Sequence, residues 1–382
     1  MTTIDRQQRV LAERWFLERG LPAVLRPGAL VRRVWQRSAP GLAGYAVVMT
    51  FSLVFVLATG QHTIDIAGAP TRAEWFVLAS IVAVLPVAAL TGWLTSRVAD
   101  DRLRSVVSAV SVAVVMISAA VGGPTPRLLV DLVIEAVVVG LILACTATGV
   151  GAILGWAVRI MLANLASVGD LLLGALPVML LTVLVFFNGP VWTMASTVSR
   201  ARLWLALLFL FTIAVSFLLS STLARVRPIL LPDAKRPEDA ANLVGTPFET
   251  MPDRPRRVAL SRSERLNVRF VLALSQIVQV MTVALVTGLL FLVLGLILVS
   301  PEMLAALTRG GPSDGQILGM TLPIPQALIQ LTMFLTALTF MYLAARAVGD
   351  SEYRTRFVEP LLDDLRLTLV ARDRYRTATK SG

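Results

Sequence analysis

Eight continuous apolar runs, each long enough to cross a bilayer, dominate this chain of 382 residues. A helix rises 1.5 Å per residue, so about 20 apolar residues cross the roughly 30 Å of hydrocarbon in a membrane. The runs do not alternate with polar residues, and a spanning helix satisfies its own backbone polar groups, so only helices are expected. The predicted spans are residues 41–59, 75–95, 105–121, 128–151, 171–192, 203–223, 270–299 and 324–348.

The predicted fold class is all-α, a polytopic transmembrane helical bundle of about eight spans with both termini cytoplasmic. Composition agrees with this class, because 56% of the residues are hydrophobic, 15% are charged, and the mean hydropathy is +0.76. Soluble domains carry more charge and less apolar surface.

The positive charges are distributed unevenly between the predicted loops. The net charge is +11, yet with both termini inside only five cations fall in the outer loops: Arg72, Arg127, Arg200, Arg202 and Arg309. This asymmetry follows the positive-inside rule and predicts the orientation. Membrane topology thus accounts for the basic residues, and nucleic-acid binding is not expected. The expected partner of the cytoplasmic cations is the anionic lipid headgroups on that side of the bilayer.

The cations are almost all arginine, the exceptions being Lys235 and Lys380. Together with abundant Ala, Val and Leu, this usage is typical of GC-rich bacteria and predicts a multi-pass protein of the bacterial cytoplasmic (inner, or plasma) membrane. No cleavable signal is expected, because a charged stretch of 40 residues precedes the first apolar run. Cys145 is the single cysteine, so no internal disulfide is expected.

Five segments are predicted along the chain. They are a cytoplasmic amphipathic N-terminal segment (1–40), a six-span block (41–224) with an interfacial helix near 154–170, a cytoplasmic Pro/Arg-rich linker (225–269), a two-span block (270–348), and a cytoplasmic amphipathic C-terminal helix (349–382). The first segment is expected on the membrane surface or docked on the bundle. The linker lacks apolar periodicity, which predicts poor order. For the last segment, docking on the chain's own cytoplasmic face is preferred to pairing with a protein partner.

The fourth predicted span carries two acidic residues, Asp131 and Glu135. They are four residues apart and so share a helix face, with Asp131 within a turn of the outer end and Glu135 about 10 Å deep. In the structural interpretation, Asp131 pairs with Arg127 and Glu135 contacts a polar group of a neighbouring helix. In the functional interpretation, the two acids form a proton or cation site open to the outer side, because an acid at this depth costs free energy.

Two glutamines, Gln326 and Gln330, lie near the outer end of the eighth predicted span and complete the candidate intramembrane polar site. Glutamines in a membrane more often join helices than contact substrates. His62, the only histidine, lies in a predicted outer loop, which excludes bis-histidine haem ligation and Ser/His/Asp catalysis within the spans. No catalytic residue, metal ligand or cofactor is expected.

The motif FFNGPVW, residues 186–192, predicts a turn at the outer end of the fifth span, with Trp192 as an interfacial anchor. Together with Asp350, Tyr353, Arg354 and Phe357, it resembles an uncharacterised group of actinobacterial polytopic membrane proteins. The resemblance covers residues 155–375. It departs from that group's pattern after Asn188, where an acidic residue is expected instead of Gly-Pro. The group has no assigned activity, so none is implied.

The function predicted first is a non-enzymatic transport component, a transporter or the membrane partner of one, with Asp131 and Glu135 as site residues. The alternative is a structural or assembly scaffold that recruits partners through its cytoplasmic linker and tail. A lipid-linked transferase using Asp65 and Glu74 of the first outer loop is a third possibility, disfavoured because the outer loops are short.

Overall fold

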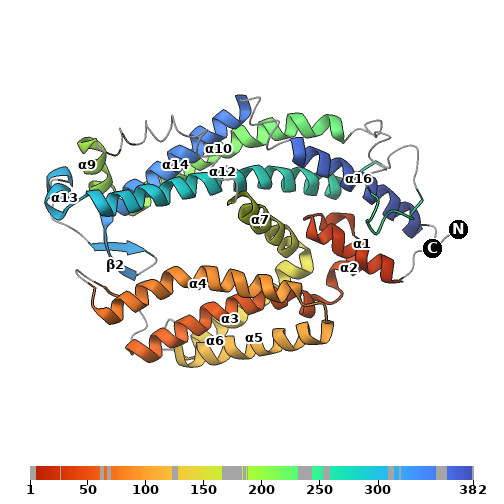
Figure 1. The fold of residues 1–382 in the computed structure, drawn as a ribbon, viewed down its shortest axis with the longest axis horizontal. Coiled ribbons are helices and arrows are strands. Elements are labelled where there is room, and N and C mark those ends of the chain that lie inside the picture. The colour runs from red at the N-terminus through yellow and green to blue at the C-terminus, as the bar shows by residue number, and fades with distance from the viewer. Residues whose placement is uncertain are drawn as a thin grey trace. The chain divides into compact units, whose positions relative to one another are not determined.

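The computed structural model is almost entirely helical in the part of the chain that it describes, which confirms the all-α prediction (Figure 1). The described residues are 6–25, 27–60, 64–66, 70–122, 128–165, 183, 186, 188–230, 243–252, 259–308, 314–317, 320–349 and 359–380. Seven helices in these ranges are long and apolar enough to cross a membrane. The chain is therefore a multi-pass integral membrane protein. Its predicted fifth span, 171–192, lies mostly outside the described residues.

The helices form two compact units, each considered by itself. The α3–α6 unit comprises Pro27–Gly151 and Ser313–Gln326, and the α12 unit comprises Met1–Arg26, Ala152–Pro312 and Ala327–Gly382. This division differs from the predicted blocks of six and two spans. The reason is that helices distant in sequence pack together, which hydropathy along the chain does not reveal.

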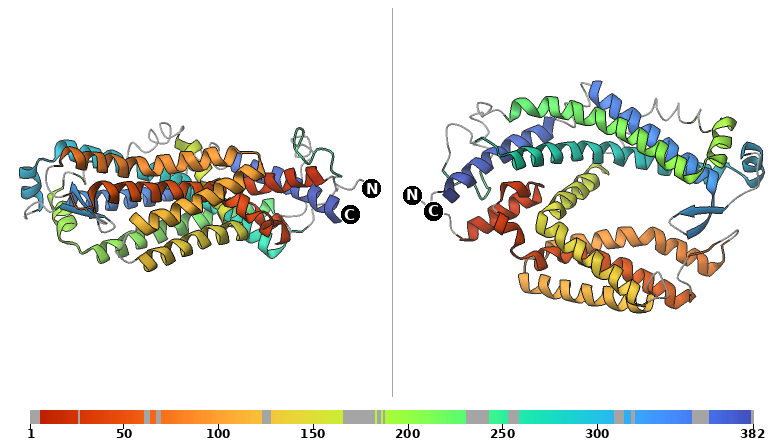
Figure 2. Two further views of the ribbon diagram at one scale, coloured as in Figure 1. Left: turned by 90° about the horizontal axis from the view of Figure 1, so that it is seen from below. Right: turned by 180° about the vertical axis from the view of Figure 1, so that it is seen from behind.

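Four long helices make up most of the α3–α6 unit: α3 (Val34–Thr59), α4 (Arg72–Arg97), α5 (Asp101–Gly122) and α6 (Leu128–Thr148), preceded by the short α2 (Pro27–Val31). Helix α3 contacts the other three long helices (Figure 2). Its core joins Leu42 of α3 to Val115 of α5 and Val139 of α6. On another side, Gly44 and Gly92 let α3 and α4 approach, since a Cβ at either glycine would lie 3.1 or 3.0 Å from a backbone oxygen of the facing helix.

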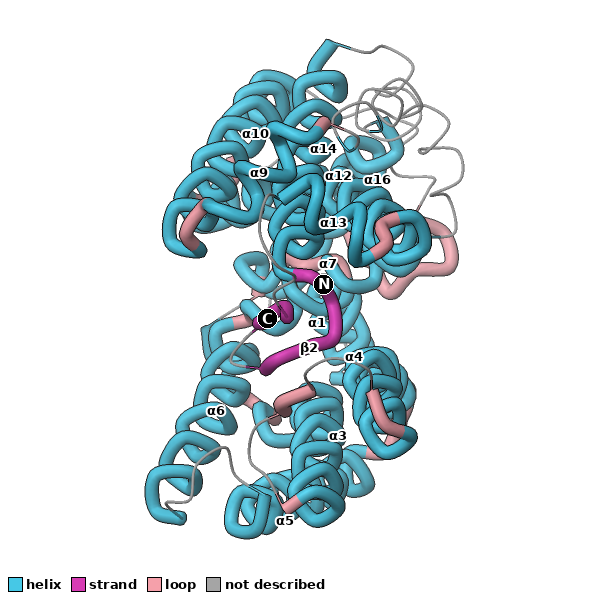
Figure 3. Tube along the Cα trace, turned by 90° about the vertical axis from the view of Figure 1, so that its left-hand side faces the viewer, coloured by secondary structure: helices cyan, strands magenta, loops and turns pink. Residues whose placement is uncertain are grey.

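A short β-hairpin belongs to the same unit and was missed by the sequence analysis, which expected helices only (Figure 3). Strand β1 (Asp314–Ile317) pairs antiparallel with β2 (Met320–Pro325). Thr321 also exchanges backbone hydrogen bonds with the segment after α3, at 2.9 Å to the Ile64 oxygen and 3.1 Å from the Ile66 nitrogen. Strand β2 was not predicted because its apolar residues continue directly into the apolar helix that follows.

One helix of 37 residues, α12 (Arg262–Leu298), organises the α12 unit. It packs against α10 (Arg200–Ile229) and α14 (Gln326–Gly349) around a core that includes Leu218, Ala284 and Phe340 (Figure 1). Gly288 allows close contact with α14, since a Cβ there would lie 2.0 Å from Thr336 Oγ1. The other helices are α7 (Val150–Leu165), α9 (Gly189–Thr197), α13 (Pro301–Thr308), the 3-10 turn η1 (Pro22–Val24), α1 (Arg6–Glu18) and α16 (Glu359–Lys380).

Several predicted boundaries differ from the observed ones. The fourth span was predicted to end at residue 151, but α6 ends at Thr148 and α7 begins at Val150, because Gly149 adopts a positive φ of 84°. Helix α7 covers the described part of the predicted interfacial helix. Both α10 and α12 extend into the predicted linker, where the chain remains helical although it is no longer apolar.

Both terminal helices dock on the α12 unit. Phe16 of α1 and Tyr375 of α16 are buried with ring centroids 5.6 Å apart, and Phe248 lies 5.1 Å from Phe16. The docked alternative therefore holds for α1, and α16 packs on its own chain as preferred. The expected poor order does not hold for residues 243–252 of the linker, because the fully buried Phe248 fixes this segment between the two helices.

Candidate functional site

Glu135 lies inside the α3–α6 unit and has a hydrogen-bond partner that the sequence analysis did not identify. Its side chain is 3% exposed, and the Tyr45 hydroxyl donates to Glu135 Oε2. Tyr45 belongs to α3 and packs against the core that joins α3, α5 and α6. A polar group of a neighbouring helix thus faces Glu135, as the structural interpretation requires.

Asp131 is also buried, with 1% of its side chain exposed, one helical turn before Glu135 on the same face of α6. Its predicted partner, Arg127, lies outside the described residues. Ser118 of α5 is fully buried beside the core residue Ala119, and its Oγ forms no hydrogen bond with any other described residue. The α3–α6 unit therefore holds two carboxyl groups and additional hydroxyl groups within an otherwise apolar interior.

The two predicted glutamines differ in their surroundings. Gln326 is the first residue of α14, and its side chain contacts the hairpin: its Oε1 accepts a hydrogen bond of 2.9 Å from the Gln316 backbone nitrogen of β1. Gln330 belongs to the α12 unit, where its Oε1 is buried and has no partner among the described residues. Asp131, Glu135 and Gln326 thus belong to the α3–α6 unit, and Gln330 belongs to the α12 unit.

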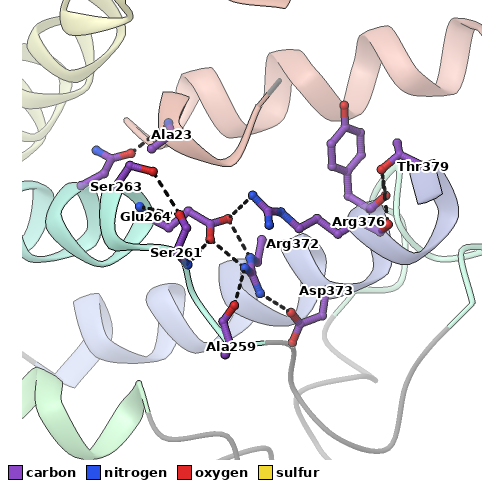
Figure 4. Close-up of polar contacts among 11 residues, drawn as sticks. Ala23, Ala259, Ser261, Ser263, Glu264, Arg372, Asp373, Arg376 and Thr379 are labelled. Atoms are coloured by element: carbon purple, nitrogen blue, oxygen red, sulfur yellow. Dashed lines mark hydrogen bonds and ion pairs between the residues drawn. The ribbon is translucent and has the colours of Figure 1, made fainter. Parts of the chain in front are cut away.

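A second polar cluster, which the sequence analysis missed, lies at the start of α12 (Figure 4). Glu264 Oε2 accepts from Arg372 Nη2 at 2.7 Å and from the Ser261 backbone nitrogen at 2.8 Å. Its Oε1 accepts from Arg372 Nε at 2.9 Å and lies 2.9 Å from Arg376 Nη2. The spacing of Ser261 and Glu264 before an apolar run signals the capping box. The arginines could not be inferred, because Arg372 lies 108 residues further along the chain.

The guanidinium group of Arg372 is fully enclosed in this cluster. It donates to Asp373 Oδ1 at 2.7 Å and to the Ala259 oxygen at 3.2 Å as well as to Glu264. Burial alone would lower the pKa of Arg372, but the hydrogen bonds and negative charges of Glu264 and Asp373 outweigh it and raise that pKa above its usual value. Every charged group is paired, so this cluster anchors α16 to α12.

The two outer acids considered for a transferase have structural roles. Glu74 closes a capping box with Thr71 at the start of α4, accepting from the Thr71 backbone nitrogen at 2.6 Å. Asp65 forms an isolated β-bridge with Thr321 of the hairpin. The capping box thus explains the position of Glu74, and long-range pairing with the hairpin explains that of Asp65.

The prediction that Trp192 is an interfacial anchor is wrong. Helix α9 begins directly after Asn188, with Pro190 in its first turn, and this places Trp192 inside the protein with no exposed surface. Its indole nitrogen donates to the Phe186 oxygen at 2.5 Å. The turn chemistry of Asn-Gly-Pro was visible in the sequence, but the direction in which the helix leaves the turn was not.

No family model, curated protein or solved structure matches this chain. The resemblance to an uncharacterised actinobacterial group therefore stays a prediction. Its tail residues Asp350, Tyr353, Arg354 and Phe357 lie outside the described residues.

Proposed function

We propose that this integral membrane protein is a non-enzymatic transport component of a bacterial cell envelope, either a transporter or the membrane partner of one. In this proposal Glu135 takes up and releases a proton, with Asp131 between it and the outer side. The observation that supports the proposal is the burial of both carboxyl groups inside an apolar four-helix unit.

Magnitudes favour a functional role for Glu135 over a purely structural one. An ionisable residue this deep in a span costs a few kcal/mol on insertion scales, about 2.5 or more. One hydrogen bond such as that from Tyr45 contributes about 0.5–1.5 kcal/mol net. A glutamine would accept the same hydrogen bond without a titratable group, so joining α3 to α6 does not by itself require an acid.

The order of groups along α6 suits uptake from the outer end of the helix. Asp131 precedes Glu135 by one turn, or about 6 Å along the axis. A proton entering from that end therefore reaches Asp131 first. At the inner end of this path, the Tyr45 hydroxyl donates a hydrogen bond to Glu135 Oε2 and holds the carboxyl group in position.

Proton flux into liposomes tests the proposal. The full chain is reconstituted with a pH-sensitive dye inside, a potassium diffusion potential is imposed, and acidification is followed. We expect faster acidification than in protein-free liposomes, loss of the difference in Glu135→Gln, and no change in Glu302→Gln, a matched control on the exposed acid of α13. Wild-type flux equal to that of protein-free liposomes would refute the proton-carrying role.

The scaffold alternative makes a different prediction. It requires a free recruiting surface on the tail, yet α16 uses Leu365, Leu369 and Tyr375 to pack on its own unit. A change on the exposed acids Glu359 and Asp363 leaves that packing intact, whereas a tail deletion would not. Loss of a cellular phenotype in Glu359→Lys/Asp363→Lys, with Glu135→Gln unaffected, would favour the scaffold.

A further inference from the structure

We propose that the basic face of α12, formed by Arg262, Arg265 and Arg269, binds the headgroup of an anionic phospholipid from the surrounding bilayer. The three arginines recur at helical spacing and are all exposed. They line an open depression of about 410 Å³ together with Leu266. This site is separate from the Glu135 site and does not depend on the proposed transport function.

The opposite face of the same two turns is fully occupied. Glu264, Asn267 and Val268 are buried there. Glu264 is held by Arg372, and Asn267 donates to the Gly20 oxygen and accepts from the Ala23 backbone nitrogen, each at 3.2 Å. The orientation of this end of α12 is therefore fixed, and the three arginines cannot turn inward.

The charge of the basic face is not neutralised by the protein in the part that the structure describes. Glu264, the only acid in the first turn of α12, points to the other face and is paired with Arg372 and Arg376. No hydrogen bond or ion pair joins the side chains of Arg262, Arg265 or Arg269 to another described residue. A ligand carrying negative charge would complete this face.

The length of α12 places the basic face at headgroup level. Thirty-seven residues make a helix of about 55 Å, well beyond the roughly 30 Å of hydrocarbon. The apolar run begins at Phe270, so the arginines lie in the turns just before it. Leu266 is 70% exposed and Phe270 is 53% exposed, which gives the acyl chains an apolar surface beside the charges. A phospholipid matches this arrangement of charge next to apolar surface, and a free phosphate would use only the charges.

Native mass spectrometry of the full chain tests the site. The protein is released from micelles containing equal amounts of phosphatidylglycerol and phosphatidylcholine with the same acyl chains. We expect wild-type protein to retain phosphatidylglycerol preferentially, and each Arg→Gln change at 262, 265 or 269 to lower that preference by about fivefold. Because the changed residues are exposed, the unfolding temperature in detergent should not move.

A matched control removes the same charge elsewhere. The triple variant Arg14→Gln/Arg102→Gln/Arg202→Gln changes three exposed arginines outside the basic face and should keep the wild-type preference. Equal loss in this control and in Arg262→Gln/Arg265→Gln/Arg269→Gln, the triple variant of the basic face, would overturn the site in favour of general electrostatic attraction. Displacement of the retained lipid by soluble glycerol phosphate at the same concentration would also overturn it, because the acyl contacts would then contribute nothing.

Discussion

At the scale of single residues, Tyr45 and Glu135 form a buried hydrogen-bonded pair whose contribution to stability can be measured. Tyr45→Phe leaves the carboxyl group of Glu135 buried without this donor, so we expect the free energy of unfolding to fall by about 1–3 kcal/mol. Glu135→Gln should destabilise less, because the amide oxygen still accepts the hydrogen bond. Unfolding in mixed micelles, followed by tryptophan fluorescence, gives both values. Tyr342→Phe, on a partly exposed tyrosine of α14, is the control and should change little.

We expect Tyr375 of α16 to lose its phenolic proton at a higher pH than an exposed tyrosine. Burial and then the charge of Glu13 raise its pKa, and Arg9 opposes them only in part. The folded state thus favours the neutral phenol, a stabilisation fully present below the unfolded pKa of about 10 and lost as the pH rises through the higher folded pKa. Absorbance at 295 nm, compared between wild type and Tyr375→Phe, should show the missing ionisation above pH 10. A difference centred at or below about pH 10 would contradict the burial.

The sequence identified Asp131 and Glu135 because an acid stands out against an apolar background. It could not identify Tyr45, since 90 residues separate it from Glu135 and its contact depends on which side of α3 faces α6. The arginine partners of Glu264 could not be identified either, because they too are distant from it in the sequence. Local chemistry was predictable for these residues, and long-range pairing was not.

At the scale of elements, the enclosed ion pairs of Arg372 should hold α16 in place. Arg372→Ala leaves Glu264 with only part of its charge compensated in a buried site, which costs about 3–5 kcal/mol. Arg366→Ala on the same helix removes a surface pair with Asp363 and should cost less than about 1 kcal/mol. Limited proteolysis of the full chain measures release of α16, which we expect to be fast only in the Arg372 variant. Similar cleavage of both variants would show that apolar packing alone retains the helix.

Most helices were predictable because hydropathy and helical spacing are local properties of the chain. The hairpin was not, since its strands depend on each other and on the segment after α3. The start of α12 at Arg262 was missed for a related reason. Its first two turns are polar, and they are stabilised by the Ser261 capping box and by Arg372, not by an apolar run.

At the scale of the whole molecule, contacts within the α12 unit restrict how often the chain crosses the membrane. Helix α1 contacts α16 through Glu13 and Tyr375, whose hydroxyl lies 3.2 Å from Glu13 Oε1, and Asn267 ties the start of α12 to the turn after α1. These three segments therefore lie on one side of the membrane, and an even number of crossings must separate each pair.

The number of described candidate spans is even from the start of α12 onward but odd before it. Two of them, α12 and α14, separate the start of α12 from α16, whereas five, namely α3, α4, α5, α6 and α10, separate α1 from α12. Five is odd, so the packing requires one crossing more or fewer before α12. The eight-span prediction meets this requirement, because its span at 171–192 would be a sixth crossing before α12. That span lies mostly outside the described residues and stays a prediction.

Cysteine labelling tests this topology directly. In a Cys145→Ser background, single cysteines replace Arg14 of α1, Asp363 of α16 and Glu302 of α13, three exposed positions. We expect a membrane-impermeant maleimide to label only position 302 in intact cells, and positions 14 and 363 only after lysis, because arginine-rich segments stay inside. Labelling of both terminal positions from outside would reverse the orientation while preserving the even count. If position 14 were labelled on one side of the membrane and position 363 on the other, α1 and α16 could not be in contact. The inference of an even number of crossings, which rests on that contact, would then be wrong.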